Sequence, residues 1–199
     1  MTFYFVRHAD KTRGDFYNPR LHHQDQPISS LGRKQAKRLR EYFRYKMISS
    51  IHVSEYVRTE QTIRPLARKL KLTPVSDARL NEIDLGDLEG LTDQQIRDKY
   101  PETWQHYLDR KADFRWPGGE TGAEAQARIV SFFTDQAASM GDKLIVAHDG
   151  IIRLLLCHIL KIPVYGRFDF KLGTAGIVEI QKEEDGDQWS IIRINQELM

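Results

Sequence analysis

Apolar residues follow two spacings along this 199-residue chain, and the two spacings alternate. Short, mostly apolar runs, typical of buried strands, occur at residues 3–6, 50–53 and 143–147. Between them, apolar residues recur every three or four positions, which predicts helices over about 30–46, from about 58 onwards, over about 121–139 and over 151–160. Alternation of this kind favours an α/β fold.

Turn and capping residues add further elements. Thr92 is an expected N-cap for a helix over 93–99, and Pro101 is expected to break or restart that helix. Thr121-Gly-Ala-Glu124 has the form of a capping box. Residues 73–75 are a possible third strand, and 175–181 and 189–194 are expected to form a hairpin through Asp185-Gly186. We therefore expect one domain over residues 1–199, a three-layer sandwich with a mostly parallel central sheet and helices on both faces.

Composition narrows the class of protein. Thirty Lys and Arg against 28 Asp and Glu give a net charge of +2, and no run of Lys or Arg forms a patch, so a nucleic-acid partner is not expected. Cys157 is the only cysteine and lies in an apolar stretch, which favours a buried, inert thiol in a reducing compartment. There is no signal-peptide pattern and no apolar run of membrane-spanning length, so we expect a cytoplasmic protein without a membrane partner.

Charged and imidazole side chains follow the predicted strands. Arg7-His8 comes after the first strand, Ser54 to Arg58 after the second, Asn81-Glu82 after Leu80, and His148-Asp149 after the strand at 143–147. In open α/β sheets, ligands bind beyond the carboxyl ends of the strands. Arginines hold phosphate oxygens, a histidine can be a nucleophile, and a carboxylate can serve as general acid. This set suits phosphoryl transfer.

Six motifs occur in order between residues 5 and 153. They are Phe5-Val6-Arg7-His8-Ala9, Leu31-Gly32-x-x-Gln35-Ala36, Ser54-x-x-x-Arg58-Thr59-x-Gln61-Thr62, Leu80-x-Glu82-x-x-x-Gly86-x-x-Glu89-Gly90, Gly119-Glu120-Thr121 and Val146-Ala147-His148-Asp149-Gly150-x-Ile152-Arg153. Together they resemble the motifs of the histidine phosphatase superfamily, which has the phosphoglycerate-mutase-like fold. The ordered set is far more specific than any single motif.

The resemblance implies a role for each of five residues. His8 would be the phosphorylated nucleophile. Arg7, Arg58 and His148 would hold the phosphoryl oxygens of the substrate. Glu82 would protonate the leaving alkoxide and then help to activate water. Neither a metal nor another cofactor would be needed.

Two features leave the substrate open. Many members of the family carry an asparagine six residues after the nucleophile, where this chain has Gly14, and Asn18 or Lys11 are possible substitutes. Asp149 replaces the usual small residue after the second histidine, and it is expected either to turn away or to bind a donor on the leaving group. Specificity is expected to lie in the loop 9–28 and in 100–116, whose aromatic residues line a pocket or form a small core.

Near Glu82, the carboxylates of Asp84, Asp87 and Glu89 compete for the acid/base role, and only the family pattern selects Glu82. Glu89 is expected to be a structural hydrogen-bonding residue.

The leading hypothesis is a phosphomonoesterase that acts on a small phosphorylated molecule through a covalent phosphohistidine, with a bell-shaped, slightly acidic pH optimum. A phosphoglycerate mutase is the alternative within the fold. A metal-dependent phosphohydrolase would use His8-x-Asp10 and His148-Asp149, but no spacing in the sequence supports a metal cage. The intact catalytic set disfavours a non-catalytic binding module.

Overall fold

A six-stranded sheet forms the centre of the protein. The computed structural model describes residues 1–183 and 188–198, and the strand order is β5-β4-β6-β1-β7-β8. The strands are β1 (Thr2–Arg7), β4 (Ile48–Val53), β5 (Val75–Ser76), β6 (Asp142–Ala147), β7 (Ile177–Lys182) and β8 (Trp189–Gln196). The first four strands are parallel, whereas β7 and β8 add antiparallel strands at one edge. The predicted mostly parallel sheet is confirmed.

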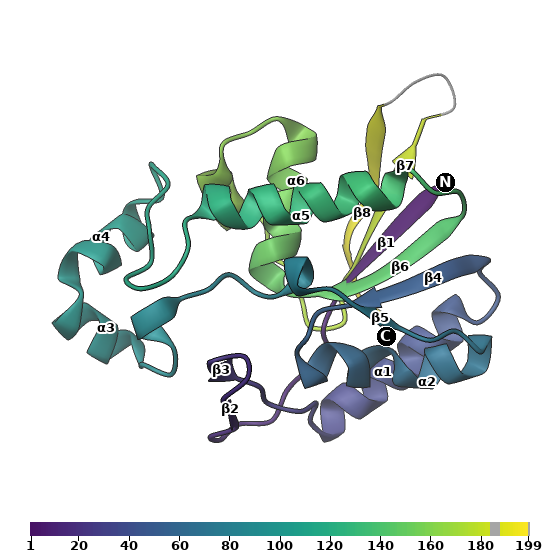
Figure 1. The fold of residues 1–199 in the computed structure, drawn as a ribbon, viewed down its shortest axis with the longest axis horizontal. Coiled ribbons are helices and arrows are strands. Elements are labelled where there is room, and N and C mark those ends of the chain that lie inside the picture. The colour runs from purple at the N-terminus through teal and green to yellow at the C-terminus, as the bar shows by residue number, and fades with distance from the viewer. Residues whose placement is uncertain (184–187, 199) are drawn as a thin grey trace.

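Helices cover both faces of this sheet (Figure 1). The helices α1 (Ser30–Phe43) and α2 (Val57–Leu70) lie on one face, and α5 (Gly122–Ala137) and α6 (Asp149–Leu160) lie on the other. Strand β1 explains why both faces are covered, because its buried side chains alternate between two cores. Tyr4 and Val6 pack in the core on the α1–α2 side, whereas Phe3 and Phe5 pack in the core on the α5–α6 side. The result is the predicted three-layer sandwich.

Capping residues set the starts of several helices. Thr92 precedes α3 (Asp93–Lys99) and Thr121 precedes α5, and each forms a complete capping box with the residue three positions later. Pro101 is the first residue of α4 (Pro101–Asp109), where its missing N–H costs no helical hydrogen bond. These predicted starts are confirmed. Figure 1 shows α3 and α4 at one end of the molecule, away from the sheet.

Some elements are too short to leave a periodic signal. Within the loop 9–28, β2 (Tyr17–Asn18) and β3 (His23–Gln24) pair as a small antiparallel hairpin. Three 3₁₀ helices were also not predicted: η1 (Ala78–Leu80), η2 (Gly86–Leu88) and η3 (Val164–Asp169).

Several boundaries differ from the prediction by two or three residues, and one predicted turn is not described. Helix α1 ends at Phe43, three residues before the predicted end. Strand β7 begins at Ile177 rather than at 175, because Ala175 has a φ of 60° and its N–H donates to the carbonyls of Arg7 and His8. The predicted Asp185-Gly186 turn lies outside the described residues. Over the described ranges, we find no helix that is both long and apolar enough to cross a membrane.

Candidate active site

The five predicted site residues gather beyond the carboxyl ends of β1, β4 and β6. Arg7 is the last residue of β1 and His8 follows it, Arg58 lies in the first turn of α2 after β4, and His148 lies between β6 and α6. The imidazole centroids of His8 and His148 are 5.3 Å apart. Burial and then the charges of Arg58 and Arg7 lower the pKa of His8, and the Glu82 carboxylate accepts from the Gly150 N–H, two residues after His148. The topology therefore brings together residues up to 140 positions apart.

His8 is held as a neutral imidazole. Its Nδ1 lies 2.8 Å from the carbonyl oxygen of Ala9, and a carbonyl only accepts, so Nδ1 carries the proton. The side chain is buried, and desolvation together with the Arg58 charge lowers the pKa of His8 to about 3. Nε2 is therefore unprotonated, which is the form a nucleophile requires.

Arg58 and His148 form a buried polar chain. Arg58 Nη2 donates to His148 Nδ1 at 3.2 Å, so Nε2 of a neutral His148 donates to Ser54 Oγ at 2.8 Å. Burial and then the Arg58 charge hold the pKa of His148 well below its usual value. The Arg58 guanidinium also lies 4.1 Å from the centroid of the Tyr56 ring.

Arg7 and Arg58 each keep unused donor capacity. A guanidinium N–H of Arg7 donates to the carbonyl of Leu172. The Nε atoms of both arginines are buried without a hydrogen-bond partner in the described part of the chain. Unpaired buried donors are uncommon in folded proteins and require an explanation. An anionic ligand is the explanation that suits two neighbouring guanidinium groups.

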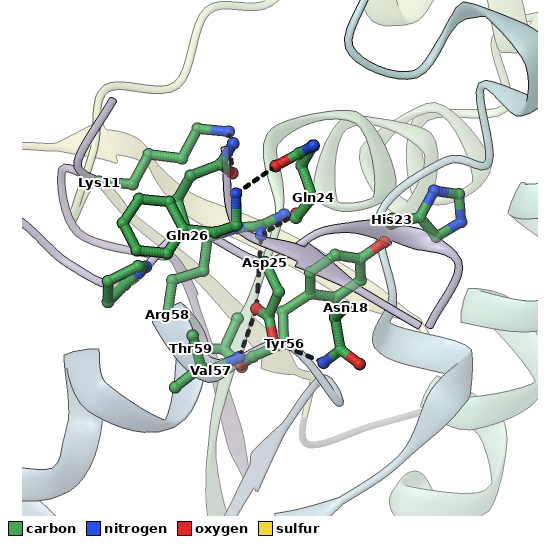
Figure 2. A network of polar contacts seen from close by, with 12 residues as sticks. Lys11, Asn18, His23, Gln24, Asp25, Gln26, Tyr56, Val57, Arg58 and Thr59 are labelled. Carbon is green, nitrogen blue, oxygen red and sulfur yellow. Dashed lines mark hydrogen bonds and ion pairs between the residues drawn. The ribbon is translucent and has the colours of Figure 1, made fainter. Parts of the chain in front are cut away.

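The loop 9–28 folds over Arg58 and fixes it (Figure 2). The Gln24 carbonyl accepts from Arg58 Nη1 at 3.3 Å, and Asp25 accepts from the Val57 N–H at 2.8 Å at the start of α2. Glu89 in turn accepts from the Gln24 N–H at 3.0 Å. Glu89 thus has the structural role predicted for it.

Lys11 comes from the same loop and adds a cation to the site. Its Nζ donates to Gln26 Oε1 at 3.1 Å, as Figure 2 shows. Partial desolvation and the Arg58 charge lower the pKa of Lys11, and the Lys11 charge lowers the pKa of His8 and His148. Asn18, the other possible substitute for the missing asparagine, instead donates to Asp25 at 3.0 Å.

Glu82 lies against the N-terminus of α6. Its carboxylate accepts from the N–H groups of Gly150 and Ile151, each at 3.2 Å. A Cβ at position 150 would lie 2.7 Å from a Glu82 carboxylate oxygen, so a larger residue there would displace this carboxylate. Arg128, which the motifs did not identify, donates to the Glu82 carbonyl at 3.0 Å and pairs with Glu120 at 2.6 Å. Hydrogen bonds therefore hold both the side chain and the backbone of Glu82 in place.

The other carboxylates near the site have structural partners. Asp84 accepts from the Gly86 N–H at 2.8 Å and lies 3.5 Å from His23. Asp10 accepts from the Ser29 hydroxyl at the start of α1, and Asp149 pairs with Arg153 at 3.1 Å. In residues 1–183 and 188–198, we find no cluster of three metal-ligating side chains.

A cavity of about 400 Å³ opens beside Glu82. Its lining includes Trp104 and Tyr107 from α4, Trp116, and Phe168 from η3. Phe114 is not part of the lining and packs edge-on against Trp116 at 4.7 Å. The sequence left open whether the aromatic residues of 100–116 line a pocket or form a small core. Trp104, Tyr107 and Trp116 line the pocket, whereas Phe114 packs against another aromatic ring. Three cations absent from the motifs also line the cavity: Arg110 and Lys171, which are exposed, and Arg167, which is buried.

Known proteins share this sequence and fold. Phosphoserine phosphatase 1 of Hydrogenobacter thermophilus is 26% identical over 184 residues, covering 90% of this chain and 85% of that protein. Phosphoglycerate mutase-like protein 4 of Arabidopsis thaliana is 29% identical over 177 residues, covering 85% and 74%. The mycobacterial glucosyl-3-phosphoglycerate phosphatase has a similar structure, with a TM-score of 0.83, 25% identity, and coverage of 98% and 99%.

A match to a family model covers nearly the whole chain. Residues 3–197 match the histidine phosphatase superfamily (branch 1). The alpha-ribazole phosphatase of Shigella flexneri, at 18% identity, has the same fold with a TM-score of 0.83 over 98% of this chain and 96% of that one. The predicted fold and the predicted phosphatase chemistry are thus confirmed at the level of the family. The chain belongs to branch 1 of the histidine phosphatase superfamily.

Proposed function

We propose that this protein hydrolyses phosphomonoesters of small molecules, with His8 as the nucleophile and Glu82 as the acid and base. One observation carries the proposal. The neutral His8 has an unprotonated Nε2 among Arg58, His148 and Arg7, with the Glu82 carboxyl at the start of α6. These are the groups that phosphoryl transfer through a covalent intermediate requires.

In the first step, His8 Nε2 attacks phosphorus and a P–N bond forms while the bond from phosphorus to the alcohol oxygen breaks. Protonated Glu82 gives its proton to that oxygen, and a neutral alcohol leaves. The guanidinium groups of Arg7 and Arg58 offset the charge that spreads over the phosphoryl oxygens.

In the second step, the Glu82 carboxylate takes a proton from water as the water oxygen attacks phosphorus. The P–N bond breaks, inorganic phosphate is released, and His8 recovers its lone pair. Glu82 returns to the protonated form, so that the cycle closes without another reactant.

Phosphate binding requires a rearrangement of the buried chain. His148 Nδ1 accepts from Arg58 in the free protein and cannot donate to a phosphate oxygen at the same time. We propose that Arg58 turns its N–H toward the phosphoryl group and that His148 takes up a proton at Nδ1, since a nearby dianion raises the pKa of an imidazole.

The leaving group of the substrate would occupy the cavity beside Glu82. Its aromatic wall suits an alcohol with an apolar or planar body, while Lys171 and Arg110 favour a negative charge on that body. The relatives named phosphoserine phosphatase and glucosyl-3-phosphoglycerate phosphatase act, by their names, on small phosphorylated molecules. This supports a substrate of the same class for this protein.

Trapping the phosphorylated protein tests the mechanism. The protein is mixed with ³²P-labelled substrate, quenched in base and digested, and the label should be acid-labile and located at His8. His8→Ala should carry no label and have no turnover. Label at another residue, or full activity of His8→Ala, would contradict the proposal.

A relative named as phosphoglycerate mutase-like keeps phosphoglycerate mutase-type phosphotransfer as the second candidate function. The two functions differ in their product. Phosphoglycerate incubated with the protein yields inorganic phosphate if water resolves the phosphohistidine, and the positional isomer if a second hydroxyl does.

We further propose that the activity is independent of metal. The carboxylates that a metal site would need are committed to Ser29 and Arg153. EDTA should leave the rate unchanged, whereas vanadate, which mimics the five-coordinate phosphoryl group, should inhibit. A loss of activity on chelation, restored by a divalent cation, would favour a metal-dependent phosphohydrolase. The cytoplasmic location stays a prediction.

A further inference from the structure

Helices α1 and α2 carry positive charge that the active site does not explain. Their 28 residues hold nine Lys or Arg and two Glu, a net charge of +7, whereas the whole chain has only +2. The other 171 residues therefore have a net charge of −5. Of the nine cations, only Arg58 belongs to the candidate active site. Charge is thus strongly segregated to one layer of the sandwich.

Six of these cations line one groove between the two helices. The groove has a volume of about 820 Å³, and α1 and α2 lie side by side in Figure 1. Pro27, Ile28, Ala36 and Pro65 supply its apolar lining. The lining cations are all exposed, with Arg33, Lys37 and Arg40 on α1 and Arg64, Arg68 and Lys69 on α2. Helical spacing gathers them in space although they form no run in the sequence.

Few counter-charges neutralise the groove. Arg40 and Arg64 pair with Glu41 and Glu60, which do not line it. In the described part of the chain, the Arg33 side chain donates only to the Ile28 carbonyl, at 3.4 Å. The side chains of Lys37, Arg68 and Lys69 make no hydrogen bond or ion pair within residues 1–183 and 188–198. Like charges at this spacing destabilise a helix pair unless an anion lies among them.

We propose that this groove binds a small anion that carries several phosphate groups. Three cations on each wall can contact such an anion from both sides, and the hollow has the size of a small-molecule site. Single-stranded nucleic acid is disfavoured, because that class of ligand stacks on aromatic side chains and the lining contains none. This site is separate from the candidate active site, whose residues do not line it.

Isothermal titration with inorganic tripolyphosphate tests the proposal in a His8→Ala background, which blocks hydrolysis of the probe. The groove variant is Arg33→Gln, Lys37→Gln and Arg68→Gln. A control with the same net charge is Lys99→Gln, Lys111→Gln and Lys161→Gln, three exposed lysines that do not line the groove. Both variants keep the same active site, so a difference between them reports the groove alone.

We expect the groove variant to bind tripolyphosphate at least tenfold more weakly than the control, and the affinity of the parent to fall as NaCl is added. Lys37→Glu alone should also weaken the binding of tripolyphosphate, and it replaces the triple variant in the titration if that variant does not fold. Equal affinity of the two triple variants would overturn the proposal. So would a short single-stranded RNA that binds more tightly than tripolyphosphate through the same residues, because the groove would then be a nucleic-acid site. Loss of turnover in His8→Ala, by contrast, tests only the catalytic proposal.

Discussion

The phosphoryl end and the leaving-group end of the site are built from different parts of the molecule. His8, Arg58 and His148 are buried beyond the ends of central strands, and backbone groups or buried side chains fix each of them. The leaving-group cavity is lined by the segment 82–88 and by parts of α3, α4, α6 and η3, and neither α3 nor α4 contains a buried residue. A buried phosphoryl end that needs only a local reorientation of Arg58 and His148 suits chemistry that depends on preorganised charge, while a lightly packed cavity suits variation in the substrate.

Removing the nucleophile is the strongest test of this division. His8→Ala should lower kcat by about 10³-fold or more on every phosphomonoester, because the covalent route is lost whatever leaving group fills the cavity. Steady-state phosphate release on a panel of substrates measures the effect. His158→Ala, an exposed histidine on α6, is the matched control and should leave the rates unchanged. A loss confined to some substrates would place His8 in recognition instead of chemistry.

The phosphoryl end was also the more predictable of the two. Each of its residues follows a strand whose apolar run is visible in the sequence, and parallel strands bring their carboxyl ends to one edge. Arg128 was missed because it acts on carbonyl groups of residues 79, 81 and 82, and a backbone contact leaves no pattern in the sequence. The groove cations were missed because three-to-five-residue helical spacing, not a run, gathers them.

The leaving-group end was predicted only as a set of aromatic residues. Trp104 and Phe114 have the same chemical character in the sequence, yet one lines the cavity and the other packs behind Trp116. That choice depends on how α4 and η3 pack, and η3 is too short to show a period. Composition therefore indicated that a pocket could exist but not which side chains form it.

Glu82 lies at the boundary between the two ends, and its replacement should depend on the leaving group. Glu82→Gln keeps an oxygen that can accept from the Gly150 N–H but has no proton to give. We expect kcat to fall by about 10²–10³-fold on alkyl phosphates and much less on 4-nitrophenyl phosphate, whose leaving group needs no proton. Glu89→Gln still accepts from the Gln24 N–H and is the control. Equal losses on both substrates would argue against the general-acid role.

Acid should destabilise the phosphoryl end specifically. The pKa of His8 is about 3 in the folded protein, whereas an unfolded histidine titrates near its model value of 6.5. Between these values the unfolded state binds the extra proton, so the free energy of unfolding falls as pH falls, by about 1.4 kcal/mol per pH unit. His8→Asn should therefore lose about 2 kcal/mol less than the parent between pH 7 and pH 5.

Urea unfolding at the two pH values measures this difference. If the free energy of unfolding falls equally for the parent and for His8→Asn between pH 7 and pH 5, then the surroundings of His8 do not hold it neutral. The same low pKa means that the acid limb of kcat/KM assigned to His8 lies near pH 3, so activity at pH 5 should not be limited by protonation of the nucleophile.

Lys11 tests whether the loop 9–28 contributes to the phosphoryl end. Lys11→Met removes a cation whose charge acts on His8 and His148. We expect KM to rise by about tenfold with a smaller change in kcat, as for loss of one charge-assisted contact to phosphate. Arg13→Met, an exposed cation two residues further along, is the control. An unchanged KM would remove Lys11 from the phosphate-binding set.

The smallest and most selective effect is expected at the cavity. Trp104→Ala removes one aromatic wall from α4 but touches none of the five proposed catalytic residues. We expect kcat/KM for an aryl phosphate with a carboxylate to fall by about five- to tenfold, and that for a short alkyl phosphate to change by less than twofold, because only the larger leaving group reaches the wall. Trp189→Ala lies in β8, outside the cavity, and controls for the loss of a tryptophan. If Trp104→Ala lowers both substrates equally, α4 supports the phosphoryl end as well, and the division between a fixed chemical end and a variable specificity end does not hold.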